Sequence, residues 1–206
     1  MRVDPPHPGE ELNDGEVTEP RQAASIVVLR DSPLGPEVLL VQRNPAQRFM
    51  GGAWVFPGGA LHADDADHAA AAVRELREEA GIALPAGAEV AHWSRWITPE
   101  EVKVRFDTWF FVAAAPPGAE ARPDGGECVD ARWLRPAAAL EASSRDEIML
   151  VFPTIKHLEA LASMESVAEA LEKARRREVV PVQPRVVVRG EAAKIVLPGE
   201  EGDEEG

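Results

Sequence analysis

Two hydrophobic periods alternate along the chain and predict its secondary structure. Short runs rich in Val, Ile, Leu and Phe stand between turn-forming residues in the first two thirds, a pattern typical of strands. The runs at 23–30 and 37–42 flank a turn at 31–36 and predict a β-hairpin. Further strands are predicted at residues 53–56, 89–97, 105–115 and 128–134.

A helical period replaces the strand period at residues 66–80. Small and aliphatic residues there recur every three to four positions and form one apolar stripe. Asp64 or Asp65 is predicted near the N-cap, and Gly81 follows where a helix favours glycine. Later patterns predict helices at 136–142, 154–163 and 166–177, and a terminal hairpin from two strand-like runs within 179–197.

This order of elements predicts an α/β fold, in which a mixed sheet lies between helical layers. A chain of 206 residues suits one domain with modest additions. Residues 1–21 are rich in proline and acids and are predicted to be disordered. The domain is expected at 22–198, with a C-terminal helical extension from about 143, and residues 199–206 are expected to be a disordered acidic tail.

Charge and composition exclude several classes of function. The net charge of −14 argues against non-specific nucleic-acid binding, which needs a basic surface. No apolar run is long enough to span a membrane, and residues 1–19 lack the apolar core of a secretory signal. Cys128 is the only cysteine, so an intramolecular disulfide is impossible and a cytoplasmic location is expected.

The candidate chemistry lies on the helix predicted at 66–80. At 100° per residue, Glu75, Glu78 and Glu79 share an arc of roughly 100° opposite the apolar stripe. Three clustered carboxylates repel one another unless a cation binds them, and Mg²⁺ prefers oxygen ligands of this kind. Arg74, four residues before Glu78, can pair with a carboxylate. A solvated acidic face is the alternative for such a pattern taken alone.

The surrounding residues favour the metal-site interpretation. Gly58–Gly59 upstream, the arginine, the glutamates and Gly81–Ile82 together resemble the Nudix box, G-x5-E-x7-R-E-U-x-E-E-x-G-U, where U is apolar. The second half of this box matches at every specified position. The first half differs, because Asp65 stands where the pattern has glutamate and the gap to Arg74 is one residue longer. The candidates to replace that glutamate are Asp64, Asp65 and Asp67.

The resemblance to the Nudix hydrolases implies an α/β/α sandwich and metal-assisted hydrolysis of a diphosphate. Mg²⁺ or Mn²⁺ would be held by Glu75, Glu78 and Glu79 with the carbonyl of Gly59, and Arg74 would orient these ligands. The base that activates water would be Glu75 or Glu127, the latter placed after a glycine pair at the start of a predicted strand.

Stretches outside the box are similar to the Nudix branch that contains the mammalian peroxisomal coenzyme A diphosphatase. They include Phe49–Gly59, Trp96–Pro99 and Arg105–Phe111. This similarity implies coenzyme A or an acyl derivative as the substrate. Candidate substrate-binding residues are Arg43, Arg48 and Arg105 for phosphates, with Trp54 and Phe56 as further contacts.

Several alternatives stay open at this point. A diphosphatase for ADP-ribose, a nucleotide sugar or a dinucleotide would share the metal site and differ in the pocket. A non-catalytic Nudix ligand-binding or regulatory domain would usually lack the metal carboxylates, which are all present here. An isopentenyl diphosphate isomerase-like enzyme would need Cys128 in its pocket. The expected partner is a small diphosphate molecule, and a homodimer is an open alternative to a monomer.

Overall fold

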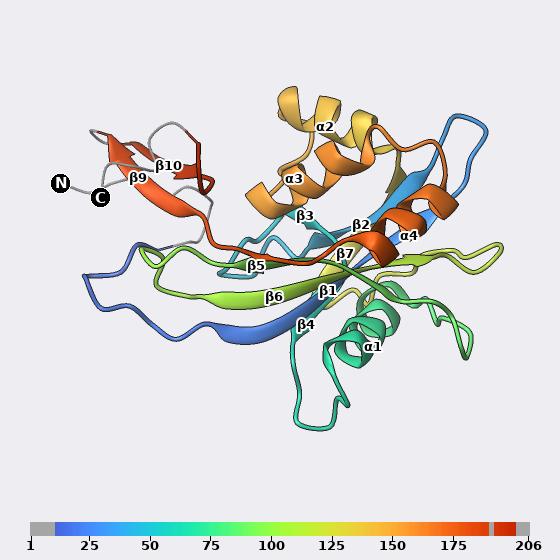
Figure 1. The fold of residues 1–206 in the computed structure, drawn as a ribbon, viewed down its shortest axis with the longest axis horizontal. Coiled ribbons are helices and arrows are strands. Elements are labelled where there is room, and N and C mark those ends of the chain that lie inside the picture. The colour runs from blue at the N-terminus through green and yellow to red at the C-terminus, as the bar shows by residue number, and fades with distance from the viewer. Residues whose placement is uncertain (1–10, 190–191, 201–206) are drawn as a thin grey trace.

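The computed structural model describes residues 11–189 and 192–200, and its core is one eight-stranded mixed sheet (Figure 1). The main strand order is β3-β2-β1-β6-β5-β8, with β4 paired to β1 and β7 paired to β2. The strands are β1 (Arg21–Arg30), β2 (Glu37–Arg43), β3 (Trp54–Val55), β4 (Gly58–Ala60), β5 (Ala91–Ile97), β6 (Phe106–Ala114), β7 (Cys128–Leu134) and β8 (Pro181–Val182).

The centre of the sheet is the long parallel pairing of β1 with β6. Its register runs from Arg21 beside Phe106 to Leu29 beside Ala114. β1 also pairs antiparallel with β2 at one end and with β4 at the other. Strand β1 is therefore bonded on both sides, which explains its nearly continuous run of buried apolar residues.

Helices cover both faces of this sheet, which confirms the predicted α/β/α sandwich. Helix α1 (His68–Ala80) packs on one face, and α2 (Pro136–Ser144), α3 (Phe152–Leu161) and α4 (Val167–Arg176) pack on the other (Figure 1). Alternate residues of β1 serve the two layers, because successive side chains of a strand point to opposite faces. Ile26 belongs to the core beneath α1, and Val27 to the core beneath α3 and α4.

Helix α1 has a defined cap at each end. The Asp67 carboxylate accepts the N–H of Ala70 at 2.8 Å, and Gly81 adopts φ +66° while its N–H bonds to the carbonyl of Arg77. The predicted N-cap at Asp64 or Asp65 is therefore wrong, and the helix begins at His68. Asp65 cannot cap the helix because its carboxylate is bound elsewhere, to the Arg74 guanidinium and the His62 N–H.

The C-terminal hairpin is a separate two-stranded sheet, as the sequence predicts. β9 (Arg185–Arg189) pairs antiparallel with β10 (Ala192–Val196), and Figure 1 shows the hairpin beside one end of the main sheet. The N–H of Val186 donates to the Glu101 carboxylate at 3.2 Å, which joins the hairpin to the β5–β6 connection. Residues 201–206 of the predicted tail lie outside the described residues.

Part of the N-terminal region contacts the β5–β6 connection. Residues 1–10 of the segment predicted to be disordered lie outside the described residues, but residues 11–20 run beside the β5–β6 connection. The N–H of Lys103 donates to the Glu11 carbonyl at 2.8 Å, and Leu12 forms an isolated bridge with Val102. Arg21 is already the first residue of β1. No described helix is long and apolar enough to cross a bilayer.

Candidate active site

Strand β4 brings two glycines against helix α1. A Cβ atom added at Gly59 would lie 2.3 Å from Oε1 of Glu75, and one added at Gly58 would lie 2.6 Å from the carbonyl oxygen of Ala24. Neither position accepts a side chain without a backbone shift. The glycine pair therefore allows the backbone of β4 to lie directly beside the Glu75 carboxylate.

Glu79 is one of two glutamates on α1 that are buried. Its side chain accepts the N–H of Gly58 at 2.9 Å and a hydrogen bond from the Cys128 thiol. Burial raises the pKa of Glu79 to about 7, although the Gly58 hydrogen bond opposes this shift. The nearby charge of Glu75 raises this pKa further. A carboxyl group with this pKa would gain from a cation that favours its charged form.

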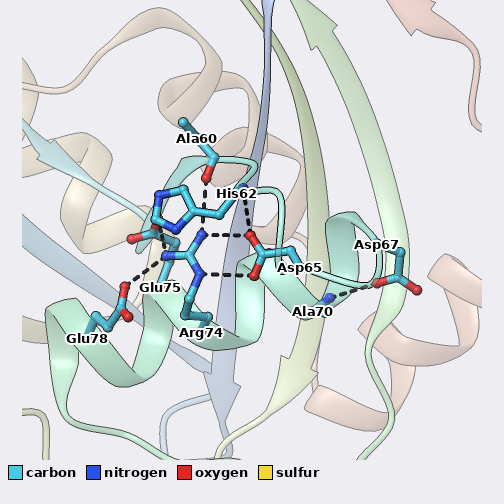
Figure 2. Close-up of polar contacts among 8 residues, drawn as sticks. All are labelled: Ala60, His62, Asp65, Asp67, Ala70, Arg74, Glu75 and Glu78. Carbon is cyan, nitrogen blue, oxygen red and sulfur yellow. Dashed lines mark hydrogen bonds and ion pairs between the residues drawn. The ribbon is translucent and has the colours of Figure 1, made fainter.

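Arg74 gathers the other carboxylates of the site, as Figure 2 shows. Its Nη1 donates to Glu75 at 2.7 Å and to Glu78 at 2.8 Å. Its Nη2 donates to the Ala60 carbonyl at 3.1 Å, which ties the helix to strand β4. Burial raises the pKa of Glu75, and the Arg74 hydrogen bond acts against that shift. Glu78 is the exposed member of the three glutamates.

Asp65 takes the position left by the missing first glutamate of the box. Nε and Nη2 of Arg74 donate to its two carboxylate oxygens at 3.0 and 2.9 Å, so the pair is bidentate (Figure 2). The Arg74 hydrogen bonds lower the pKa of Asp65 to about 2. Asp67 caps the helix and Asp64 is exposed. Of the three candidates, Asp65 is thus the residue that holds the arginine.

A cavity of about 420 Å³ opens beside this cluster. Its floor on β1 and β6 includes the small residues Ala23, Ala24, Ser25 and Thr108. The C-terminal hairpin closes part of it with Ile195, together with Pro184 just before β9. The aromatic residues that line the cavity are Phe49, Phe56, Trp96, Phe106, Phe110 and Phe152. The space thus suits a ligand with flat or apolar parts.

Four of the predicted site residues line this cavity. Gly59 and Glu127 lie at the end next to α1, and Arg43 and Phe56 join them from β2 and the β3–β4 link. The Glu127 carboxylate has no hydrogen bond to another described residue. The Nε atom of Arg43 is buried without a partner among the described residues. This group of residues is therefore free to contact a ligand.

Three other candidate substrate contacts, Arg48, Arg105 and Trp54, do not line this cavity. The side chain of Arg48 is 92% exposed and pairs with Glu11. Arg105 is buried and donates to the carbonyls of Thr98 and Thr18 at 3.1 and 2.6 Å, so it holds the N-terminal segment instead of a phosphate.

Trp54 is also in a structural position. It is buried in the core between the sheet and α3, and the Arg132 guanidinium lies 4.5 Å from its ring centre. Neither of these two residues lines the cavity. Sequence position alone did not distinguish core aromatics from cavity aromatics, because both occur in strands.

Arg21 lines the cavity and was not among the predicted residues. It falls at the end of the segment predicted to be disordered, whose composition gave no sign of a strand. The available signal was strand alternation, which places residue 21 on the same face as residues 23 and 25. That signal could be used only if β1 was known to begin at residue 21.

The donor chemistry of the α1 cluster fits a hard divalent cation. Glu75 and Glu78 already meet at one cationic group, Nη1 of Arg74, and the glycine at 59 leaves room for a close approach of backbone and carboxylate. Glu79 faces the Gly58 N–H instead. No three acidic, histidine or cysteine side chains of the described residues converge closely enough to form a complete metal cage. Mg²⁺ sites of few carboxylates completed by substrate phosphates are common.

The comparisons with known proteins agree with this geometry. The NUDIX domain family matches residues 19–152, so the chain belongs to the Nudix hydrolase family. The uncharacterized Nudix hydrolase NudL of Klebsiella aerogenes is 47% identical over 62 residues, which are 30% of this chain and 51% of NudL. The crystal structure of a NUDIX hydrolase from Alicyclobacillus acidocaldarius superimposes with a TM-score of 0.67 at 27% identity, covering 75% of this chain and 96% of that one.

A human relative is named for a particular substrate. Acyl-coenzyme A diphosphatase NUDT19 of Homo sapiens is 28% identical over 115 residues, which are 53% of this chain and 31% of NUDT19. The matched region thus spans about half of NudL and about a third of NUDT19. The domain match confirms the family, and the chain is similar to these two relatives over part of their length.

Proposed function

We propose that this protein is a Mg²⁺- or Mn²⁺-dependent hydrolase that cleaves the diphosphate of coenzyme A or an acyl-coenzyme A. The observation that carries this proposal is a single cavity with two different ends. Its lining includes Gly58, Gly59 and Glu127 beside the carboxylate cluster, and it continues past the small residues of β1 to aromatic residues of β5, β6 and α3. A substrate with a diphosphate joined to a long, partly apolar group matches both ends.

The metal would be held by Glu75, Glu78 and Glu79 with the carbonyl oxygen of Gly59. When bound, such a cation neutralises charge on the diphosphate in the transition state. Arg74 positions the carboxylates of Glu75 and Glu78 through its Nη1 group. Asp65 in turn fixes the arginine, because a bidentate pair leaves the guanidinium little freedom to rotate.

Glu127 is the better placed of the two candidate bases. It lines the cavity, is exposed, and has no hydrogen-bond partner for its carboxylate among the described residues. The Glu75 carboxylate instead accepts a hydrogen bond from Arg74 at 2.7 Å, so one of its oxygens is already engaged within the protein. Oε of Glu127 would therefore take the proton of the attacking water.

The alternative functions have less support from the residues at this site. Cys128 is fully buried, does not line the cavity, and burial together with Glu79 raises the pKa of its thiol, which argues against an isomerase-like cysteine. The site carboxylates are present, which argues against a domain that only binds ligands. ADP-ribose and dinucleotides remain the second candidate substrates, because they carry the same diphosphate.

Product analysis tests the substrate assignment. The purified chain is incubated with Mg²⁺ or Mn²⁺ and, separately, coenzyme A, an acyl-coenzyme A, ADP-ribose and a dinucleoside diphosphate. Adenosine 3′,5′-bisphosphate and a phosphopantetheine are the expected main products, and EDTA should abolish them. Preferential cleavage of ADP-ribose would replace the coenzyme A assignment, and no cleavage of any compound would favour a binding domain.

A charge-removing substitution on α1 tests the carboxylate cluster. Glu79→Gln keeps the size of the side chain and removes a ligand charge, so kcat should fall by roughly 10²- to 10³-fold. Arg77→Gln is the matched control, because Arg77 is exposed on the same helix. Its kcat should stay within about twofold of the unchanged protein. A fully active Glu79→Gln variant with normal melting would remove this carboxylate from the mechanism.

A further inference from the structure

The charged residues that line the cavity differ in sign from the protein as a whole. The chain carries a net charge of −14, yet the charged lining among the described residues is two arginines, Arg21 and Arg43, and one glutamate, Glu127. Local positive charge raises the concentration of an anionic ligand in a cavity. The two arginines come from different strands, so they can serve different groups of one ligand.

The direction of the Arg21 side chain follows from its neighbours on β1. Gln22 lies on the face of α1, where its amide donates to Asp107 at 3.0 Å and its side-chain oxygen lies 2.9 Å from His68. Arg21 therefore points to the opposite face, with Ala23 and Ser25 of the cavity floor.

The Arg21 guanidinium is unengaged among the described residues. No ion pair or side-chain hydrogen bond joins it to another of them, although its backbone N–H donates to the Arg105 carbonyl at 2.9 Å. Arg95, by contrast, lies on the other face of the sheet edge and makes two bonds to Asp107, at 2.8 and 2.6 Å. Within the described part of the chain, Arg21 is thus a cation without an ion-pair partner, and it lines the cavity.

Arg21 is set apart along β1 from the strand position beside the α1 cluster. Gly59 pairs with Ala24, which is three residues from Arg21 on the same strand. At about 3.3 Å per residue, the two backbone positions are roughly 10 Å apart. The charge of Arg43, by contrast, lowers the pKa of Glu79. Arg43 is therefore the arginine beside the carboxylate cluster, and Arg21 is available for another anionic group of a ligand.

An aromatic ring lies beside Arg21. In the parallel pairing of β1 and β6, Arg21 is in register with Phe106, and both residues line the cavity. Phe49 adds a second ring, with its centre 6.0 Å from that of Phe106. This arrangement suits a base that contacts the rings while an attached anionic group meets the guanidinium.

We infer that Arg21 binds a second anionic group of the substrate, a phosphate that is not cleaved. This inference rests on the proposed function, under which the group is the 3′-phosphate of the adenosine moiety of coenzyme A. A charge-assisted hydrogen bond of arginine to phosphate can be bidentate and changes affinity by about 10- to 100-fold. Arg21 would thus be a specificity residue that separates coenzyme A from compounds without this phosphate.

Two substrates that differ only in this phosphate test the inference. The unchanged protein should have a kcat/KM for coenzyme A about 10- to 100-fold above that for 3′-dephospho-coenzyme A. Arg21→Gln should remove this preference and leave kcat/KM for the dephospho compound within about twofold. Arg21→Lys should keep part of the preference, because it keeps the charge. Arg48→Gln, an exposed arginine outside the cavity, is the matched control.

Binding measurements separate this inference from the proposed function. Calorimetry with adenosine 3′,5′-bisphosphate and with AMP requires no turnover. Arg21→Gln should weaken the first by about 10- to 100-fold and leave the second unchanged, even if the enzyme cleaves a different diphosphate. Equal weakening of both ligands, or none, would overturn the role of Arg21. A protein that hydrolyses only ADP-ribose but shows the binding difference would overturn the substrate and not the subsite.

Discussion

The two ends of the candidate site are built in different ways. The carboxylate end lies within residues 58–81, where β4 and α1 follow each other closely along the chain. The cavity end is assembled from residues as far apart as Arg21 and Ile195, on β1, β5, β6, α3 and the C-terminal hairpin. One end is a local motif, and the other exists only after the whole chain has folded.

The two ends of the site should therefore tolerate amino-acid substitutions differently. At the carboxylate end, a single Cβ at Gly59 would overlap the Glu75 carboxylate, so the packing there leaves no room for a side chain at residue 59. At the cavity end, many side chains line the space, and we expect a single change there to alter substrate preference more than rate. Substitutions at the first end should affect kcat or folding, and substitutions at the second should affect kcat/KM between substrates.

The largest expected effect is on the packing beneath α1. Leu76 is completely buried in the core between α1 and the sheet, so Leu76→Ala should lower the free energy of unfolding by about 2–5 kcal/mol. Leu34→Ala is the matched control, because Leu34 is 73% exposed and the change should stay within about 0.5 kcal/mol. Urea denaturation measures both. An unchanged Leu76→Ala variant would mean that the helix is rotated from the orientation described.

The next largest expected effect is a loss of folding stability at low pH, caused by a histidine behind the cavity end. His157 is buried behind the cavity wall; its Nδ1–H donates to the Pro153 carbonyl, and its Nε2 accepts from the Ser94 hydroxyl at 2.6 Å. Burial lowers its pKa to about 4, helped by the charge of Arg177. The unfolded chain takes up this proton near pH 6.5, and the folded protein takes it up only near pH 4.

Between these two values the unfolded state binds more protons, so stability falls as pH falls. From pH 7.5 to pH 5 the loss should be about 2 kcal/mol. Urea denaturation at a series of pH values measures it, and His157→Gln, which lacks the titrating group, should show a smaller loss over the same range. A pH dependence identical in the two proteins would contradict this role for His157.

The smallest expected effect distinguishes two neighbouring aspartates at the carboxylate end. Asp65→Asn removes the charge that fixes Arg74. Activity should fall by about tenfold, because loss of a residue that orients metal ligands typically has an effect of at least this size. Asp64→Asn changes an exposed residue and should leave activity unchanged. Steady-state kinetics at saturating Mg²⁺ compares them. Equal activities would show that Arg74 is positioned without Asp65.

Much of the carboxylate end could be predicted from the sequence, because its spacing is fixed by one helix. The 100° advance per residue places Glu75, Glu78 and Glu79 on one arc wherever the helix lies. The identity of the aspartate that replaces the first glutamate could not be predicted. The loop at 61–67 decides it, by directing Asp65 to Arg74 and Asp67 to the helix N-terminus.

At the cavity end, by contrast, little could be predicted from the sequence. Arginines at positions 43, 48 and 105 look alike in the sequence, but the fold places one in the cavity, one in solvent and one beneath the N-terminal segment. The composition around Arg21 predicts disorder and gives no sign of a site residue. The pairing of β1 with β6 places Arg21 beside Phe106. Contacts between residues far apart in sequence depend on strand order and register, which local patterns do not encode.

The sequence by itself determined the α/β/α class, the carboxylate helix and its glycine partner, because helical and strand periods and short spacings act locally. Only the tertiary structure decided which arginines are free, which aromatics line a cavity and which belong to the core, and how the C-terminal hairpin closes the far wall. The physical reason is that burial and pairing of a side chain depend on every element packed around it, and those elements come from the whole chain.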